Sequence, residues 1–296
     1  MNKISRDILK FLFVVEYLTI PVLTNGPRTD YCFVECQRER NLTHTVCKRL
    51  HECGPIKGCI AIESDENFRS HILHQHNEIR NSIANGSEKG PYGNTGAKNM
   101  FALSYDIELE YIAACSVNLC AGPHDDWCND SERFPVGKNQ VLGKNVNWTV
   151  RAVPEFYKRI VYFTDADEIN EYKPVRPDLR YIESFLRLVW AETRFVGCAR
   201  SRRDTEDGES MLACLYGPAF YIKGRPVYKM AKMPFEIASE CETGRNKEYS
   251  ALCGNINTVP KDISWVNEPL SSVESVYGKY SLQLCFCLFL LTLLEY

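Results

Sequence analysis

Two cysteines, Cys198 and Cys214, stand at matching places in two short runs that have the composition of β-strands. The runs cover residues 195–200 and 211–216, and the pair Asp207-Gly208 between them supplies the residues of a tight turn. A hairpin closed at this turn places the two cysteines directly opposite each other, about 4.5–5.5 Å apart, which is within reach of a disulfide. The sequence therefore predicts a disulfide-linked hairpin in an oxidised protein.

Several charged and imidazole side chains gather in a helical pattern before the hairpin. His71 and His74 are three residues apart, a spacing at which two imidazoles can bind one metal ion. No further ligand pattern accompanies them, so we expect both to face solvent. His76 falls on the apolar stripe of the same helix, and we expect a hydrogen-bonded core residue there. Glu78 and Arg80 are expected to be charges on the helix surface.

The sequence predicts three helices that would position these charged and imidazole side chains relative to the hairpin. Apolar residues at spacings of three and four predict a helix that begins near Asp65 and ends at Asn85-Gly86. A second helix is predicted from about Asp106, and a third over residues 181–190. Residues 31–59 combine many cysteines with little hydrophobic periodicity, which indicates a loop-rich arm held by disulfides. Helices that flank a short antiparallel hairpin indicate an α+β layered domain.

The composition indicates a secreted protein that does not bind nucleic acid. The chain has 296 residues and 14 cysteines, which is many for a cytosolic protein, where thiols stay reduced. A basic N-terminus followed by the apolar run 11–23 resembles a signal peptide, which we place at residues 1–26. The formal net charge of −3 leaves no basic footprint for DNA or RNA. Four Asn-x-Ser/Thr sequons fit surface glycosylation: Asn41, Asn85, Asn129 and Asn147.

A second hydrophobic segment ends the sequence. Residues 282–294 are almost wholly apolar but fall short of the ~20 residues that cross a bilayer. Small residues at Ser271-Ser272, a polar spacer and this apolar stretch together fit the signal for a glycolipid anchor. A buried terminal segment and an uncleaved membrane tail are the alternatives.

Five motifs follow one another along the chain and together extend over most of it. They are the arm that begins at Tyr31-Cys32, the helix stretch His76-Asn-Glu-Ile-Arg80, the stretch from Leu188 through Trp190 to Val196-Gly-Cys198, the stretch Cys214-Leu-Tyr-Gly-Pro218 and the loop Cys241 to Cys253. These motifs resemble the CAP superfamily, which contains the cysteine-rich secretory proteins, antigen five and the plant pathogenesis-related proteins. Within it, the arm and the closing loop resemble the insect venom-allergen antigen-five-like proteins.

The resemblance implies a secreted α+β protein, a three-layer α-β-α sandwich stapled by disulfides. It divides the chain into a signal peptide (1–26), a cysteine-rich N-terminal arm (27–64), a CAP domain (65–230), a C-terminal extension closed by a disulfide (231–272) and the hydrophobic tail (273–296). The pairings that it implies are Cys32–Cys47, Cys36–Cys128, Cys198–Cys214 and Cys241–Cys253. It pairs Cys120 with Cys53 or Cys59, and Cys115 with whichever of these two is left.

Many CAP proteins carry a cleft with two histidines and two acidic residues, a set that suits zinc. Matched position by position, the first histidine falls at His124, and Ser184 stands where the second is expected. Lys144 replaces the acid of a Gly-Glu-Asn motif, and Arg159 lies near the place of the other acid. Lysine and arginine offer no lone pair to a metal. We therefore expect the metal site to be lost and no cofactor to be bound.

A CAP scaffold with a charge-inverted cleft favours a secreted, non-enzymatic binding module. Its partner is expected to be an extracellular protein or a lipid such as a sterol. Tyr216, Phe220 and Tyr221 would line an apolar groove for such a ligand, although packing against the hairpin is the simpler interpretation. One alternative is a hydrolase or protease. Because Ser184 has no histidine close in sequence, His124 would work in it with a residue brought near by folding. The other alternative is a module tethered to a cell surface by a lipid anchor.

Overall fold

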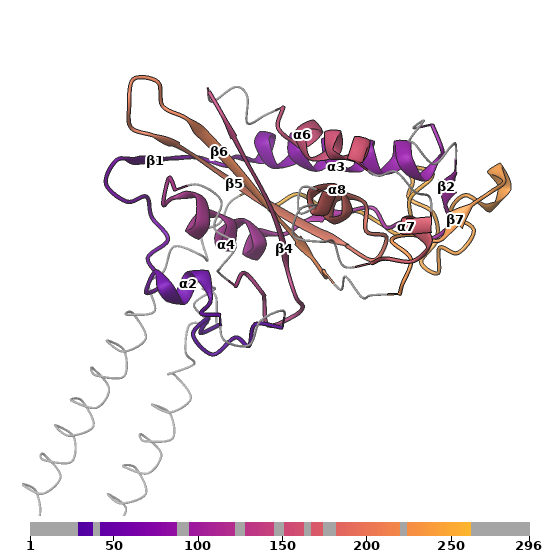
Figure 1. Cartoon of the computed structure of the whole chain (residues 1–296), viewed down its shortest axis with the longest axis horizontal. Helices are drawn as coiled ribbons and strands as arrows, with labels where there is room; N and C mark the ends of the chain where they lie inside the picture. Colours follow the sequence, from indigo (N-terminus) through magenta and orange to yellow (C-terminus); the bar gives the residue numbers. More distant parts are fainter. Residues whose placement is uncertain are drawn as a thin grey trace, which may run out of the picture.

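The computed structural model describes residues 29–37, 42–87, 95–121, 128–144, 151–162, 167–173, 182–219 and 224–261 (Figure 1). Its centre is a five-stranded sheet with the path β1-β5-β6-β4, in which β3 pairs with β5 in parallel and all other pairs are antiparallel. The strands are β1 (Cys59–Ile62), β3 (Ser104–Tyr105), β4 (Gly137–Gly143), β5 (Phe195–Arg203) and β6 (Ser210–Gly217), and a small second sheet pairs β2 (Gly96–Ala97) with β7 (Met230–Ala231).

Helices cover both faces of the sheet. Figure 1 shows α3 (Glu66–Ala84), α6 (Val153–Tyr157) and α8 (Ile182–Val189) on one face, and α4 (Ile107–Val117) with α2 (Thr45–Lys48) on the other. Each face has its own cluster of buried apolar side chains. The shorter helical segments are η1 (Lys158–Tyr162), α7 (Asp167–Asn170) and η3 (Pro234–Glu236). This confirms the predicted three-layer α-β-α sandwich.

The β5–β6 hairpin forms in the predicted register, with Cys198 directly opposite Cys214 and joined to it. Because side chains alternate between the faces of a strand, Cys198 and Cys214 enter the core under α3, whereas Ala199 and Ala213 enter the core under α4. Gly197 lies against α4 so closely that a Cβ there would stand 2.3 Å from the backbone nitrogen of Glu110. A side chain at this position would push the helix off the sheet.

The predicted helices begin where their capping residues stand. The Asp65 carboxylate accepts a hydrogen bond from the amide of Phe68 at 2.7 Å, and α3 follows directly. The Asp106 carboxylate caps α4 in the same way, at 3.0 Å from the amide of Leu109. These local bonds satisfy backbone donors that have no partner inside the helix, which is why the sequence indicates the helix starts so well.

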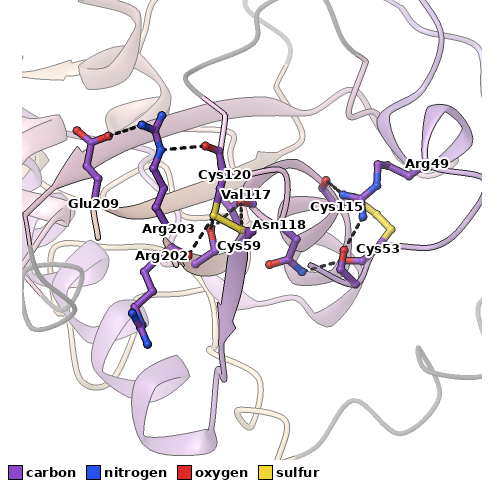
Figure 2. The surroundings of a disulfide bond; sticks show 12 residues. Arg49, Cys53, Cys59, Cys115, Val117, Asn118, Cys120, Arg202, Arg203 and Glu209 are labelled. Carbon is purple, nitrogen blue, oxygen red and sulfur yellow. Dashed lines mark hydrogen bonds and ion pairs between the residues drawn. A yellow bond between two sulfur atoms is a disulfide. The ribbon is translucent and has the colours of Figure 1, made fainter. Parts of the chain in front are cut away.

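Six disulfides in the described part of the chain hold the layers and the arm together. Figure 2 shows two of them, which join the arm to the end of α4: Cys53 pairs with Cys115, and Cys59 pairs with Cys120. These two bonds answer the question that the sequence left open. Arg49 reinforces them by donating to the carbonyl of Cys115 at 3.0 Å. The other four pairs are Cys32–Cys47, Cys36–Cys128, Cys198–Cys214 and Cys241–Cys253.

The arm is more than a loop. Its last residues form β1, which pairs antiparallel with β5 and lengthens the central sheet. The short run 59–62 has too few residues for a periodic signal. Its strand conformation is imposed by the free edge of β5 and by the bond from Cys59 to Cys120.

Arg80 corrects an expectation, because it is not a surface charge. Its side chain is fully buried, and its guanidinium donates to the carbonyl oxygens of Phe101, Leu188 and Trp190 at 2.7–3.0 Å. These acceptors come from segments far along the chain, so helical spacing alone assigns the residue wrongly. Glu78, by contrast, is exposed as expected.

A second buried charge network connects α3 with α4. Arg69 and Glu110 are 2% and 3% exposed, and they form a two-pronged ion pair with N–O distances of 2.8 and 2.9 Å. The Tyr105 hydroxyl donates to the same carboxylate at 2.6 Å. Removing one partner of a buried pair leaves an uncompensated charge in the interior.

We therefore expect Glu110→Leu to lower the free energy of unfolding by about 3 kcal/mol. The double variant Arg69→Met/Glu110→Leu should lose less free energy of unfolding than Glu110→Leu alone, because no unpaired charge then remains in the interior. Urea unfolding with the disulfides intact measures both. The exposed pair of Lys229 and Glu240 is the control, and Glu240→Gln is expected to change stability by less than ~1 kcal/mol. A double variant less stable than the single one would contradict this account.

Candidate functional site

Three of the four residues that the motif match assigns to the family cleft lie on or directly after elements around α8. Ser184 is on α8, Lys144 directly follows β4, and Arg159 lies in η1. Helix α8 contacts both β4 and η1, and Figure 1 shows α8 next to β4. We call this surface the α8 face. His124 lies outside the described residues.

Ser184 is held in place through its backbone. It is half-buried, and its carbonyl accepts a hydrogen bond from Nδ2 of Asn139 at 2.8 Å, which ties α8 to β4. A serine nucleophile needs a base within hydrogen-bond reach. Four imidazoles in the described part of the chain make hydrogen bonds, and their partners are residues other than Ser184. These partners lie on the arm, in the core and beside α3, and the histidines are His44, His51, His74 and His76.

The charges on the α8 face are mainly positive. Lys144 and Arg159 are exposed. Glu183 is the carboxylate of α8, and it forms an ion pair with Arg187 one helical turn later. Arg187 also donates to the carbonyl of Lys138 on β4 at 2.8 Å. The one acid of this helix thus has a partner, and Lys144 and Arg159 offer no lone pair to a metal ion.

Sequence reasoning missed the ion pair of Glu183 and Arg187, although its signal was present. A glutamate four residues before an arginine on a helix is a favoured pairing. The hydrogen bond from Asn139 to the carbonyl of Ser184 had no such signal in the sequence. It depends on the pairing of β4 with β6, which places Asn139 opposite Cys214 and turns its buried side chain toward α8.

His76 is a core residue, as its place on the apolar stripe predicts. It is fully buried, with Nδ1 2.7 Å from the carbonyl of Ile72 and Nε2 2.9 Å from the hydroxyl of Tyr216. Burial lowers the pKa of His76 to about 4. The sulfurs of Cys198 and Cys214 lie nearby, but they are bonded to each other and supply no thiolate to a metal.

The aromatic residues of the hairpin do not open a groove where the structure describes them. Tyr216 is fully buried and bonded to His76, so the packing interpretation holds for it. Phe220 and Tyr221 lie outside the described residues. His71 and His74 are exposed on α3, as expected.

The sequons differ in exposure. Asn85 is exposed at the end of α3. Asn129 is 7% exposed, and its Oδ1 accepts a hydrogen bond from the Thr45 hydroxyl at 3.0 Å. This corrects the expectation of a surface site at Asn129, because the folded domain leaves no room for a glycan on a side chain packed against α2. Asn41 and Asn147 lie outside the described residues.

The hydrophobic segments expected to serve as signal peptide (1–26) and tail (273–296) also lie outside the described residues. Within the part that the structure describes, no helix is long and apolar enough to cross a membrane.

Comparison with known proteins agrees with the fold and the motifs. Residues 73–216 match the model of the cysteine-rich secretory protein family, CAP. The chain is 31% identical over 228 residues to venom allergen 3 of Solenopsis invicta, across 73% of this chain and 95% of that protein. It is 32% identical over 213 residues to venom allergen 5.02 of Vespa crabro, across 68% of this chain and 98% of that protein. Among solved structures, NaASP2 with Zn2+ has the same fold, with a TM-score of 0.51 and 22% identity over 68% of this chain and 100% of that one. The chain therefore belongs to the CAP family of cysteine-rich secretory proteins and is similar to its venom-allergen, antigen-five branch.

Proposed function

We propose that this protein is an extracellular, non-enzymatic binding module that uses the CAP scaffold without the metal chemistry of its cleft. The observation that carries the proposal is the residue types on the α8 face: Ser184, Lys144 and Arg159, which the motif match assigns to the family cleft, offer neither an imidazole nor a carboxylate. The Glu183 carboxylate is engaged by Arg187. A hydrolytic site would need a metal-bound water or an activated nucleophile with its base.

Several features support an extracellular location. Six disulfides join the described part of the chain, and such bonds persist in oxidising compartments. The N-terminal apolar run fits a signal peptide, and Asn85 offers an exposed sequon. The apolar tail would tether the protein to a cell surface through a glycolipid. In that form it would present the same binding module at a membrane.

The partner on the α8 face would be an extracellular protein or an amphipathic lipid with an anionic group. Exposed Lys144 and Arg159 provide the charge to attract it. The formal net charge of −3 argues against nucleic acid as that partner.

Native mass spectrometry of the purified full chain, with and without zinc, tests this proposal. Zinc is a suitable probe because NaASP2, which shares the fold, was solved with it. We expect no one-to-one zinc adduct of the wild-type protein. The restoring variant Lys144→Glu/Ser184→His should form one, because it returns a carboxylate and an imidazole to the positions that the family uses. The same spectra would show a lipid retained from the source.

The matched control is His124→Ala, alone and in the restored variant. The adduct of the restored variant should disappear with His124. A wild-type protein that binds one zinc ion, and loses it in His124→Ala, would contradict the proposal and revive an active cleft.

A further inference from the structure

One disulfide differs from the others in its exposure. Of the six bonds in the described part of the chain, Cys32–Cys47 is the one in which neither cysteine is buried: Cys32 is exposed and Cys47 is half-buried. We propose that Cys32–Cys47 is a thiol-exchange site, at which an external thiol opens the bond and His51 protonates the departing sulfur of Cys32. This inference is independent of the α8 face, because the site lies on the N-terminal arm.

The imidazole of His51 is placed for this role. Its Nε2 lies 3.8 Å from Sγ of Cys32 and 3.4 Å from Oδ1 of Asp30. The same Asp30 oxygen accepts a hydrogen bond from the backbone amide of Cys32 at 3.0 Å. The Asp30 carboxylate therefore orients both the imidazole of His51 and Cys32, the residue to which this ring would deliver a proton. The side chains of His51 and Asp30 are 20% and 42% exposed, so solvent and a small thiol reach them.

The backbone takes an unfavourable conformation to place this ring. Leu50 and His51 are consecutive non-glycine residues with φ values of 51° and 63°, in the left-handed region that L-residues avoid. The turn is held by hydrogen bonds from the amide of Leu50 to the carbonyl of Cys47 at 2.9 Å and from the amide of His51 to the carbonyl of Val46 at 3.0 Å. The turn reverses the chain at the end of α2, so that His51 lies beside the Cys32–Cys47 disulfide. Strained positions of this kind gather at functional sites.

The exchange proceeds in two balanced steps. A thiolate attacks Sγ of Cys47, the S–S bond breaks, and Cys32 leaves with the electron pair and takes up a proton delivered through Nε2 of His51. This leaves a mixed disulfide on Cys47. A second thiolate attacks the outer sulfur of that mixed disulfide and releases the thiolate of Cys47. Two external thiols are oxidised to one disulfide, and the protein bond is reduced to two cysteines.

Opening this bond leaves the rest of the domain in place. The arm stays joined through Cys36–Cys128, and Tyr31 remains stacked on His44 with ring centroids 4.7 Å apart. His76 also lies beside a disulfide, Cys198–Cys214, but it offers no comparable site, because it and both of these cysteines are fully buried. A thiol can therefore act on the arm without unfolding the core.

The test is the rate of reduction of each disulfide in the full chain by reduced glutathione at pH 7, followed by alkylation and peptide mapping. We expect Cys32–Cys47 to open at least about tenfold faster than Cys241–Cys253, a local bond with one buried cysteine. The glutathione adduct should be found on Cys47. His51→Asn should slow the opening by about tenfold, because the acid for the leaving thiolate is lost. Asparagine is chosen because it tolerates the left-handed conformation.

His71→Asn is the matched control, since His71 is exposed on α3, and it should leave all rates unchanged. Unchanged reduction of the other five bonds in His51→Asn shows that this variant is folded. The proposal is overturned if Cys32–Cys47 opens no faster than Cys241–Cys253, if the adduct is on Cys32, or if His51→Asn opens as fast as the wild type. The first two measurements use the wild-type protein and need no variant to fold.

Discussion

Replacing Arg80 with alanine is expected to lower the free energy of unfolding by about 5 kcal/mol. The guanidinium is fully buried and donates to the carbonyl oxygens of Phe101, Leu188 and Trp190. Without it, the carbonyls of Phe101 and Leu188 lose this donor, while that of Trp190 keeps the amide of Thr193 at 3.2 Å. A buried acceptor left without a donor costs about 1–3 kcal/mol. Because the acceptors lie on the segment after β2 and at the end of α8, the substitution loosens the joint between α3, α8 and the start of β5.

Arg80 remains a cation at neutral pH despite its burial. Desolvation lowers its pKa from 12.5 to about 9. Arg80→Lys is expected to recover little of the stability, because an ammonium group cannot span carbonyls that the planar guanidinium reaches in several directions. Urea unfolding with intact disulfides, followed by tryptophan fluorescence, measures both variants. Glu78→Ala, at an exposed site on the same helix, should stay within about 0.5 kcal/mol of wild type. A loss below ~1 kcal/mol in Arg80→Ala would show that water replaces the guanidinium.

Acidification from pH 7 to pH 4 is expected to destabilise the fold by about 6 kcal/mol through two buried histidines. Burial lowers the pKa of His76 and of His44 from 6.5 to about 4. For His76, the positive charge of Arg80 acts in the same direction. The folded state therefore resists protonation at both rings, whereas the unfolded chain takes up both protons near pH 6.5.

The sign follows from this difference in bound protons. Above pH 6.5 both states hold neutral imidazoles and the stability is fully present. Between pH 6.5 and pH 4 the unfolded chain binds more protons, so stability falls as the pH falls, by up to ~1.4 kcal/mol per pH unit for each histidine. Below pH 4 the folded state is protonated too, and this contribution is lost.

Urea midpoints measured from pH 8 to pH 4.5 would record this loss above the range in which most carboxylates titrate. His76→Gln should remove about half of the slope, whatever its stability at pH 7, because one titrating ring is gone. His71→Gln, at an exposed position, should leave the slope unchanged. A slope in His76→Gln equal to that of wild type would mean that other groups dominate the acid response.

The elements that position the candidate site were largely predictable from the chain. Helix α3 and helix α4 begin at their capping aspartates, and β5 and β6 pair in the register that centres their cysteines on the turn. The resemblance to CAP proteins added the layer order. Motif matching predicted residues for the family cleft, and two of them, Ser184 and Arg159, lie on the touching elements α8 and η1.

What the sequence determined by itself was local: caps, apolar spacing, the turn of the hairpin and the residue types at the cleft positions. These features depend on neighbours within a few residues, so they can be recognised directly from the order of residues along the chain. Tertiary structure alone decided the surroundings of Arg80, Asn129 and His51. Arg80 finds carbonyls more than twenty residues away, Asn129 packs against Thr45 of α2, and His51 meets Cys32 across a disulfide and a left-handed turn. No periodicity encodes such meetings, because burial and charge compensation depend on which distant segments the fold brings together.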